Sequence, residues 1–360
     1  MIGVKQICAV LLAGSWVLSA TGSANTFSNI YVFGDSLSDT GNDLNLSGSL
    51  NAVSSSIPVF PAAPGNLAGR FSNGPVAVEY LASRLGLSVN PHYITPPALG
   101  GLTGGTNYAQ GGALTGAENA LLPSSIPGLG ATGFKGISAQ ISDYLGVAGA
   151  ADPNALYVVW GGPNDLLNSN LAPIAACTGS ALPGVCTAVT NLANGIAALA
   201  GLGAQHILVP NLPDLGATPE AAALGLKADL HVLSLAFDSV LAGALFDLSL
   251  QFHNVVVPVD VFALEALVLQ SPSIFGLTNV TDACLTGSSA DATSVISPDC
   301  QAAGADHYLF WDEIHPTTVA DRLLGQEFAL ALGVPEPGIL ALVALSALML
   351  VGARKVRMPT

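Results

Sequence analysis

A serine, an aspartate and a histidine stand in two short segments near opposite ends of the chain. Ser36 lies in FGDSLSDTGN, residues 33–42, whereas Asp312 and His315 lie in WDEIHPT, residues 311–317. A serine hydroxyl becomes a nucleophile when a base takes its proton, and a carboxylate can hold that base in the required tautomer. The Asp-x-x-His spacing puts both side chains on one face of a single turn. These residues predict hydrolysis through a serine-bound intermediate.

Two segments between these ends could donate hydrogen bonds to a negatively charged intermediate. One is GTNYAQGGA, residues 105–113, which contains Gly112, and the other is GGPND, residues 161–165, which contains Asn164. Glycine lets backbone N–H groups approach a ligand closely, and an asparagine amide is a donor in its own right. Residues 161–165 follow an apolar run, so we expect them at the carboxyl edge of a sheet, where ligands bind in open α/β folds.

These four segments resemble, in order, the four sequence blocks of the SGNH hydrolases, the family of GDSL-type lipases and esterases. The resemblance implies that Ser36 is the nucleophile, His315 the base and Asp312 its orienting carboxylate. It also implies an oxyanion hole made by the N–H groups of Ser36 and Gly112 with the Asn164 amide. Three further stretches resemble the bacterial and plant branch of the family: GRFSNGPVAVEYLA at 69–82, GAQHILVPNLPDLGATP at 203–219 and FGLTNVTDACL at 275–285.

Apolar runs of strand length alternate with helical patterns along the chain, which predicts a mostly parallel sheet covered on both faces. The resemblance implies the three-layer α/β/α SGNH-hydrolase fold, which is flavodoxin-like, with about five strands. We expect strands at 30–33, 155–160, 205–209 and 254–259, and helices at 75–85, 138–145, 185–202, 219–252, 261–269 and 317–332. Residues 44–70 and 91–133 are rich in Gly, Pro and Ser, and we expect them to be loops.

Both ends of the chain have the composition of processing signals. Residues 1–24 hold one charge, an apolar run and a small-residue cleavage site, which predicts a secretory signal peptide rather than a buried amphipathic helix. Residues 334–360 combine Pro-Glu-Pro, a short uncharged span and a basic end. They resemble the PEP-CTERM sorting tail of exported bacterial proteins, although a plain C-terminal anchor is the alternative. The resemblance implies an exosortase-type peptidase as a partner and a transient membrane tether.

The remaining residues, 25–333, have the length of one sizeable domain, and their charge is strongly negative. They hold 23 of the 24 acidic residues but only 5 of the 9 basic ones, which leaves a net charge near −18. Nucleic acids and anionic surfaces require a cationic face, so this charge argues against both as partners.

Four cysteines remain after the signal peptide, an even number that suits an oxidising compartment. Their positions suggest the pairs Cys177–Cys186 and Cys284–Cys300, but four cysteines allow three connectivities and the sequence does not choose between them. A zinc site is the alternative, which no C-x-x-C motif or neighbouring histidine supports. We expect neither a metal nor a nucleotide cofactor.

The sequence therefore predicts an exported serine ester hydrolase of a Gram-negative bacterium, tethered to the inner membrane and then released to the cell surface or the extracellular medium. Its expected substrate is a small or lipid ester, cleaved by a lipase, esterase, phospholipase or acyltransferase. One alternative is O-deacetylation of an extracellular polysaccharide. The other is a non-enzymatic surface or biofilm protein on a hydrolase scaffold.

Overall fold

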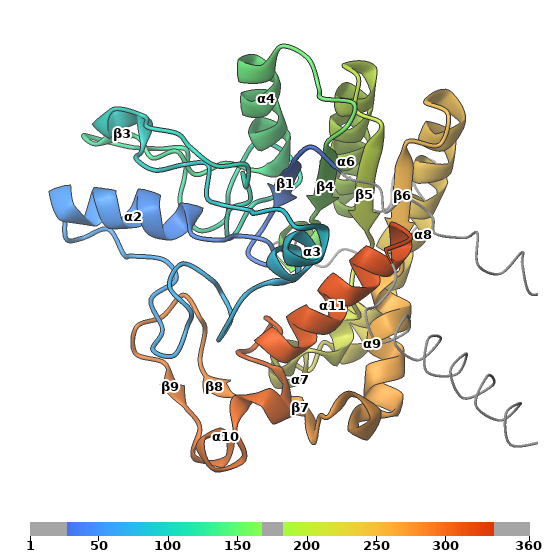
Figure 1. Ribbon diagram of the computed structural model, residues 1–360. Helices are drawn as coiled ribbons and strands as arrows, with labels where there is room; N and C mark the ends of the chain where they lie inside the picture. Colours follow the sequence, from blue (N-terminus) through green and yellow to red (C-terminus); the bar gives the residue numbers. More distant parts are fainter. Residues whose placement is uncertain (1–26, 168–182, 335–360) are drawn as a thin grey trace, which may run out of the picture. The chain divides into compact units, whose positions relative to one another are not determined.

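The central sheet is parallel and has four strands, as expected for the predicted α/β class. The structure, a computed structural model, describes residues 27–167 and 183–334. The sheet has the order β1-β4-β5-β6, formed by Ile30–Gly34, Leu156–Trp160, His206–Pro210 and Val256–Val259. Each strand runs parallel to its neighbour, so their carboxyl ends meet at one edge (Figure 1). Ser36 follows β1 and Asn164 follows β4, which places both residues at that edge.

The fifth strand position is occupied by an irregular segment rather than a regular strand. Val32 forms a parallel bridge with Asn107, and the Val32 backbone exchanges hydrogen bonds with Thr106 and Tyr108. The Gln110 N–H then donates to the Gly34 carbonyl. The chain from Thr106 to Gln110 therefore runs beside β1 and carries the following glycine turn to the same edge of the sheet.

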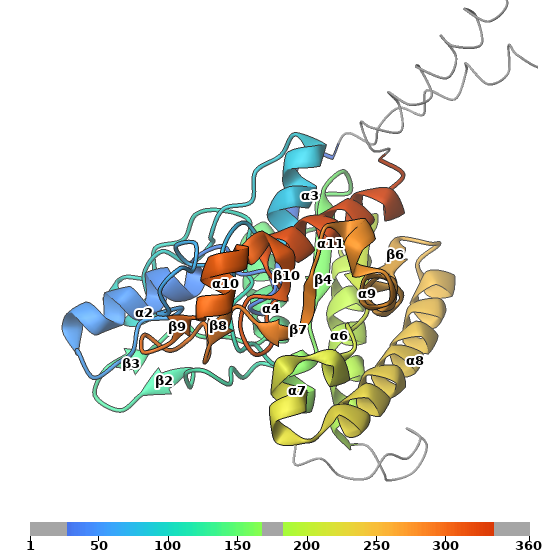
Figure 2. The same cartoon turned by 90° about the horizontal axis from the view of Figure 1, so that it is seen from below.

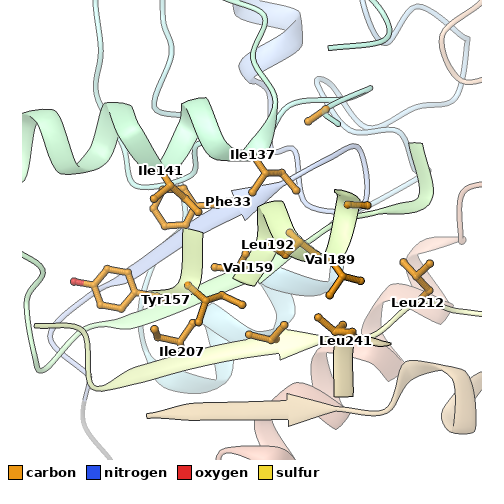
Figure 3. Packing of buried hydrophobic residues seen from close by; sticks show 14 of the residues in the cluster. Phe33, Ile137, Ile141, Tyr157, Val159, Val189, Leu192, Ile207, Leu212 and Leu241 are labelled. Atoms are coloured by element: carbon orange, nitrogen blue, oxygen red, sulfur yellow. The ribbon is translucent and has the colours of Figure 1, made fainter. Parts of the chain in front are cut away.

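Helices cover both faces of the sheet, which confirms the layered α/β class (Figures 1 and 2). On one face α4 (Ile137–Ala148), α6 (Pro183–Gly201) and α8 (Lys227–Gln251) pack side by side. Figure 3 shows Ile137, Ile141, Val189, Leu192 and Leu241 from these helices packed against alternate strand side chains, including Phe33, Tyr157, Val159 and Ile207. Side chains in a strand alternate between faces, so every second residue of each strand joins this core.

The opposite face is covered by α3 (Ala77–Leu85) and α11 (Thr318–Ala331), which pack closely on each other. Trp160, on the other face of β4 from Val159, meets Phe328 of α11 edge-to-face, with 5.5 Å between the ring centroids. Both rings are fully buried, so burial of their apolar surface helps to hold α11 on the sheet. Helix α11 directly follows the segment that carries Asp312 and His315.

The prediction that residues 44–70 form a loop is wrong for its first part, because α2 occupies Asn42–Val53. The carboxylate of Asp39 accepts the N–H groups of Gly41, Asn42 and Asp43 and so satisfies the free donors at the start of the helix. Leu46 and Leu50 are buried. Tertiary burial and this cap outweigh the low helix propensity of a sequence rich in Asn, Ser and Gly.

The long helix predicted within residues 219–252 is present as α8, but a separate short helix occupies the first part of that range. Helix α7 (Pro219–Leu224) ends at Gly225, which adopts a left-handed conformation with φ 71°, and α8 begins two residues later. By length and composition α8 could cross a membrane. However, Leu230, Phe237 and Leu241 of α8 are buried in the core, so the helix is a packed element of the domain.

The other predicted helices and strands are present with shifted ends, including α9 at Val261–Gln270. The remaining α-helices and strands among the described residues are α5 (Pro163–Leu167), α10 (Pro298–Ala303), β2 (Ser125–Ile126), β3 (Gly130–Ala131), β7 (Asn279–Ala283), β8 (Leu285–Thr286), β9 (Val295–Ile296) and β10 (Tyr308–Phe310). The short pair β2–β3 and a turn of 3₁₀ helix at Pro97–Leu99 lie within residues 91–133, which are otherwise irregular, as predicted.

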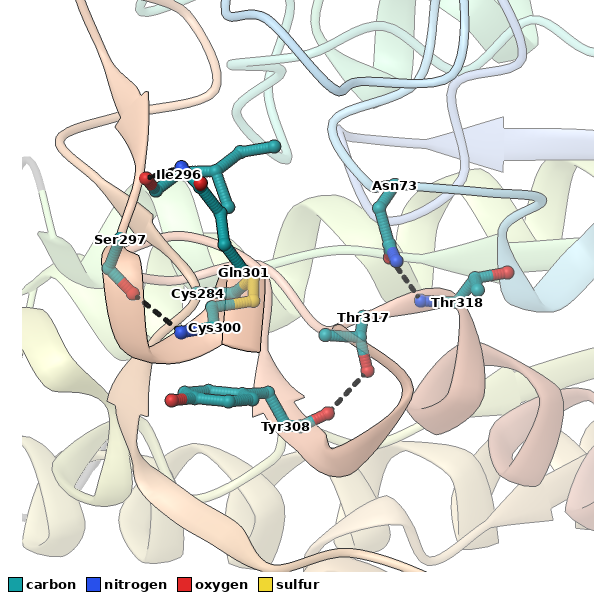
Figure 4. Close-up of a disulfide and its surroundings, with 9 residues drawn as sticks. All are labelled: Asn73, Cys284, Ile296, Ser297, Cys300, Gln301, Tyr308, Thr317 and Thr318. Atoms are coloured by element: carbon teal, nitrogen blue, oxygen red, sulfur yellow. Dashed lines mark hydrogen bonds between the residues drawn. A yellow bond between two sulfur atoms is a disulfide. The ribbon is translucent and has the colours of Figure 1, made fainter. Parts of the chain in front are cut away.

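A second, smaller core surrounds a disulfide between Cys284 and Cys300, which confirms that predicted pair (Figure 4). Both cysteines are buried beside Tyr308 and Trp311. Cys177, the predicted partner of Cys186, lies outside the described residues, as do residues 1–26 and 335–360. The division into a signal peptide, a domain at 25–333 and a sorting tail therefore stays a prediction.

Candidate active site

Ser36 sits in a tight turn directly after β1. The Asp35 carbonyl accepts the N–H groups of Ser38 and Asp39, and the Asp35 carboxylate accepts the N–H of Leu37. Gly34 lets β1 lie close to β4, because a Cβ at this position would lie 2.7 Å from the Trp160 carbonyl oxygen. A larger residue at position 34 would therefore push the two strands apart at the point where the turn begins.

The structure brings Ser36, His315 and Asp312 into one hydrogen-bonded row. His315 Nε2 lies 2.8 Å from Ser36 Oγ, and His315 Nδ1 lies 2.9 and 2.8 Å from the two carboxylate oxygens of Asp312. Asp312 is 1% exposed and His315 is 9% exposed. The Phe71 ring packs against the imidazole, with 5.3 Å between centroids. In this arrangement the imidazole can accept the serine proton while its Nδ1–H stays bonded to the carboxylate.

The opposite charges of Asp312 and His315 shift the pKa of each group. Burial acts to raise the pKa of Asp312, but the charge of His315 and hydrogen bonds from His315 and Ser289 outweigh it and lower that pKa to about 2. Burial acts to lower the pKa of His315, but the Asp312 carboxylate outweighs it and raises the pKa, with smaller contributions from Asp35 and Glu220. Asp312 therefore stays ionised at neutral pH and stabilises the imidazolium that proton transfer would form.

Backbone donors hold the Asp312 carboxylate in place. One oxygen accepts the N–H groups of Ile314 and His315, and the other accepts the Ser289 N–H at 2.7 Å. Ser289 belongs to the loop that the Cys284–Cys300 disulfide closes. Its carbonyl in turn accepts N–H groups of Ala62 and Ala63, which anchors the loop to the rest of the domain. Sequence reasoning did not find Ser289, and its only signal was its position between two cysteines.

The two other predicted oxyanion donors lie beside Ser36. Ser36, Gly112 and Asn164 all line one cavity. Gly112 adopts φ 71°, and a Cβ there would lie 2.6 Å from Leu121 Cγ, so glycine is required in this turn. One amide N–H of Asn164 donates to the Ala113 carbonyl at 3.1 Å, which joins the two donor segments. Donors from these three residues, which line the same cavity, could stabilise the charge on a carbonyl oxygen.

Asp165 reinforces this connection. Its two carboxylate oxygens accept the N–H of Thr115, at 2.9 Å, and the hydroxyl of Thr115, at 2.8 Å. Burial raises the pKa of Asp165, and the two bonds from Thr115 oppose that rise. Asp165 therefore ties the turn after Gly112 to α5, the short helix that carries Asn164.

The cavity beside Ser36 has a volume of about 270 Å³, and most of its wall is apolar. At one end it is lined by Ser36, His315 and Phe71. From there it extends across the carboxyl edge of the sheet, past Trp160, to the space between α9 and α11. This shape suits a ligand whose reactive group lies at the serine and whose apolar part fills the far end. Among the described residues, no cluster of three or more His, Cys, Asp or Glu could hold a metal ion.

The fold and site are those of a three-layer α/β/α protein in which a serine at the end of the first strand meets a histidine near the last helix. Residues 30–328 match the sequence profile of the GDSL-like lipase/acylhydrolase family. The chain belongs to this family, which confirms the family resemblance of the four sequence blocks.

Several characterised and uncharacterised proteins are similar to the chain over most of its length. An uncharacterised protein of the trpE-trpG intergenic region of Pseudomonas putida is 30% identical, covering 85% of this chain and 48% of the relative. A GDSL esterase/lipase of Arabidopsis thaliana is 28% identical, covering 89% of this chain and 95% of the relative. The phosphatidylcholine-sterol acyltransferase of Aeromonas hydrophila is also 28% identical, covering 87% and 92%. The chain spans only about half to two thirds of the length of three relatives.

Proposed function

We propose that the protein is an exported serine ester hydrolase that acts through an acyl-enzyme. One observation carries the proposal: Ser36 Oγ lies 2.8 Å from His315 Nε2, and His315 is bonded to the buried Asp312, at one end of an apolar cavity. Two relatives that the chain matches over nearly their whole length are named as an esterase/lipase and an acyltransferase, and these names support ester chemistry on an acyl group.

In the proposed reaction, Ser36 Oγ attacks the ester carbonyl carbon while His315 Nε2 takes the serine proton. The carbonyl oxygen gains the negative charge, which the N–H groups of Ser36 and Gly112 and the Asn164 amide stabilise. The intermediate then collapses, the C–O bond to the alcohol breaks, and His315 returns the proton to the departing oxygen. Water attacks the acyl-serine with His315 again as the base, which releases the acid and restores Ser36.

The wall of the cavity favours a lipid-like acyl group over the acetyl group of a modified polysaccharide. Apolar side chains dominate the far end, and burying each methylene of a bound chain there contributes about 0.8 kcal/mol. An acetyl group would leave that end unused. The strongly negative charge of residues 25–333 favours neutral or zwitterionic lipids over anionic ones.

Export and release rest on the two terminal segments. Residues 1–24 have the composition of a signal peptide, and residues 334–360 have that of a PEP-CTERM tail, the substrate of an exosortase-type peptidase. The disulfide Cys284–Cys300 supports an oxidising compartment.

The test replaces Ser36 by alanine. Hydrolysis of short 4-nitrophenyl esters should fall about 10³-fold or more in the Ser36→Ala variant, with an unchanged melting temperature. The matched control is Ser142→Ala on the exposed side of α4, which should keep full activity, because the Ser142 hydroxyl bonds only the Ser138 carbonyl. Fractionation of the same cultures should place the protein outside the cytoplasm. Full activity in the Ser36 variant would refute the mechanism, and cytoplasmic retention would refute export.

A further inference from the structure

The apolar far end of the cavity contains one carboxyl group that the proposed mechanism does not use. The inner face of α9 contributes Val261, Leu264, Glu265 and Val268, which follow the spacing of one helix face. Three of these residues are apolar and the other is Glu265. On the opposite wall α11 contributes Ala320, Leu323 and Leu324. Glu265 is therefore a polar group within an apolar binding surface.

Only one of the two carboxyl oxygens of Glu265 accepts a hydrogen bond from the described part of the protein. Oε2 accepts the Asp214 N–H at 2.5 Å, whereas Oε1 has no hydrogen-bond partner among the described residues. The Asp214 carboxylate is bonded elsewhere, to the Gly216 N–H and to His231 Nδ1. The side chain is partly buried and lines the cavity, so a bound ligand can reach it.

Glu265 is far enough from Ser36 to meet the distal part of a chain. Ser36 follows β1 and α9 follows β6, which are separated by β4 and β5. Three strand spacings of about 4.8 Å place these ends roughly 14 Å apart across the sheet. With C–C bonds of about 1.5 Å, a zigzag acyl chain of roughly ten carbons spans that distance. The acyl group stays in the site through the acyl-enzyme while the alcohol leaves, so the apolar far end suits the acyl chain.

We infer that Glu265 is a specificity residue that selects acyl chains carrying a distal hydroxyl group, an inference that rests on the proposed ester hydrolysis. An unsubstituted chain would cover Oε1 of Glu265 and leave that oxygen without a partner, and this penalty is comparable to a lost hydrogen bond. A hydroxyl group removes the penalty because it can donate to a carboxylate or accept from a carboxylic acid.

The electrostatics of Glu265 agree with this role. Burial raises the pKa of Glu265 to about 8, the Asp214 N–H opposes the rise and the Asp214 carboxylate adds to it. At neutral pH the group is mostly a neutral acid, which an apolar cavity tolerates better than an anion. It is then a hydrogen-bond donor that a ligand hydroxyl can satisfy.

The experiment compares kcat/KM for 4-nitrophenyl decanoate and for decanoates with a hydroxyl at each position from C6 to C10. The wild type should prefer at least one hydroxydecanoate by about tenfold. Glu265→Leu should abolish that preference and raise activity on plain decanoate, and Glu265→Gln should keep the preference because an amide still bonds a hydroxyl. The acetate ester, which does not reach Glu265, should be hydrolysed equally by all three. Glu327→Leu on α11, which makes the same change outside the cavity lining, should behave as wild type.

Absence of any preferred hydroxydecanoate, or a preference unchanged by Glu265→Leu, would overturn this inference while leaving the hydrolase proposal intact. Failure of the wild type to hydrolyse any of the esters would instead refute the hydrolase proposal.

If Glu265→Leu does not fold, the pH dependence of wild type and Glu265→Gln gives a second test. Above pH 8 the decanoate-to-acetate activity ratio should fall in the wild type, because the carboxylate becomes charged, and stay constant in the Gln variant. The charged groups near Glu265 are Asp214, its partner His231, and Asp260 at the start of α9, all present in both proteins. A ratio with the same pH dependence in both proteins would contradict the role of Glu265.

Discussion

The two halves of the candidate site are built in different ways. Ser36 is positioned by regular structure: β1 pairs with β4 over its whole length, and Phe33 beside the turn is fully buried in the main core. Asp312 and His315 follow the three-residue strand β10 and lie in an irregular segment held by backbone donors and a disulfide-closed loop. Thus a cooperative core positions the proposed nucleophile, while a set of separate local contacts positions the proposed base.

The largest expected effect comes from Asp312→Asn. The amide can hold His315 in the tautomer that cannot accept the serine proton, so kcat should fall about 10³- to 10⁴-fold. Steady-state kinetics with a short nitrophenyl ester measures the loss, and circular dichroism checks the fold. A variant with kcat within tenfold of wild type would show that the carboxylate does not orient His315.

The second-largest expected effect is on stability, and it tests whether the half of the site that carries Asp312 and His315 can be lost independently of the half that carries Ser36. Cys284→Ala combined with Cys300→Ala should lower the free energy of unfolding by about 2–4 kcal/mol, because the closed loop of the unfolded chain is released. Activity should be lost at lower denaturant than the far-ultraviolet signal, since the loop that carries Ser289 contacts Asp312 while the sheet does not depend on it. Coincident loss of activity and secondary structure would contradict a separate base-carrying region.

The matched control for that experiment is Phe33→Leu in the main core. This substitution removes part of a fully buried ring and should lower stability by about 1–3 kcal/mol. Activity and secondary structure should be lost together in this variant, because β1 is part of the cooperative core.

The smallest effect is a displacement of the pH profile. His315 must be neutral to accept the serine proton, and its pKa is raised by Asp312, so kcat/KM should decline as pH falls through a value above the ordinary histidine pKa of about 6.5. Loss of the Asp312 charge in Asp312→Asn should move this acid limb to lower pH. Profiles of kcat/KM against pH between pH 5 and 9 for both proteins test this. If the activity of both proteins declined at the same pH, the decline would not arise from the Asp312–His315 pair.

The sequence alone predicted the fold class, the family and five candidate site residues, of which Ser36, Gly112 and Asn164 follow strands or a strand-like segment at the carboxyl edge of the sheet. This was possible because strand periodicity and glycine-rich turns are local patterns, and parallel strands bring their carboxyl ends together whatever their separation along the chain. The same local reasoning failed at α2, where Asp39 and buried Leu46 and Leu50 stabilise a helix that the local composition disfavours.

Only the tertiary structure decided what surrounds those residues. Ser289 meets Asp312 through a backbone N–H, which any residue except proline carries, so no residue type marks it in the sequence. Nothing in the local sequence distinguishes Glu265 from an ordinary surface glutamate. Its position in the cavity wall depends on how α9 packs against the sheet edge and α11. Ser36, His315 and Asp312 could be named from local patterns, but their 2.8 Å contacts exist only because two differently built regions meet at one edge.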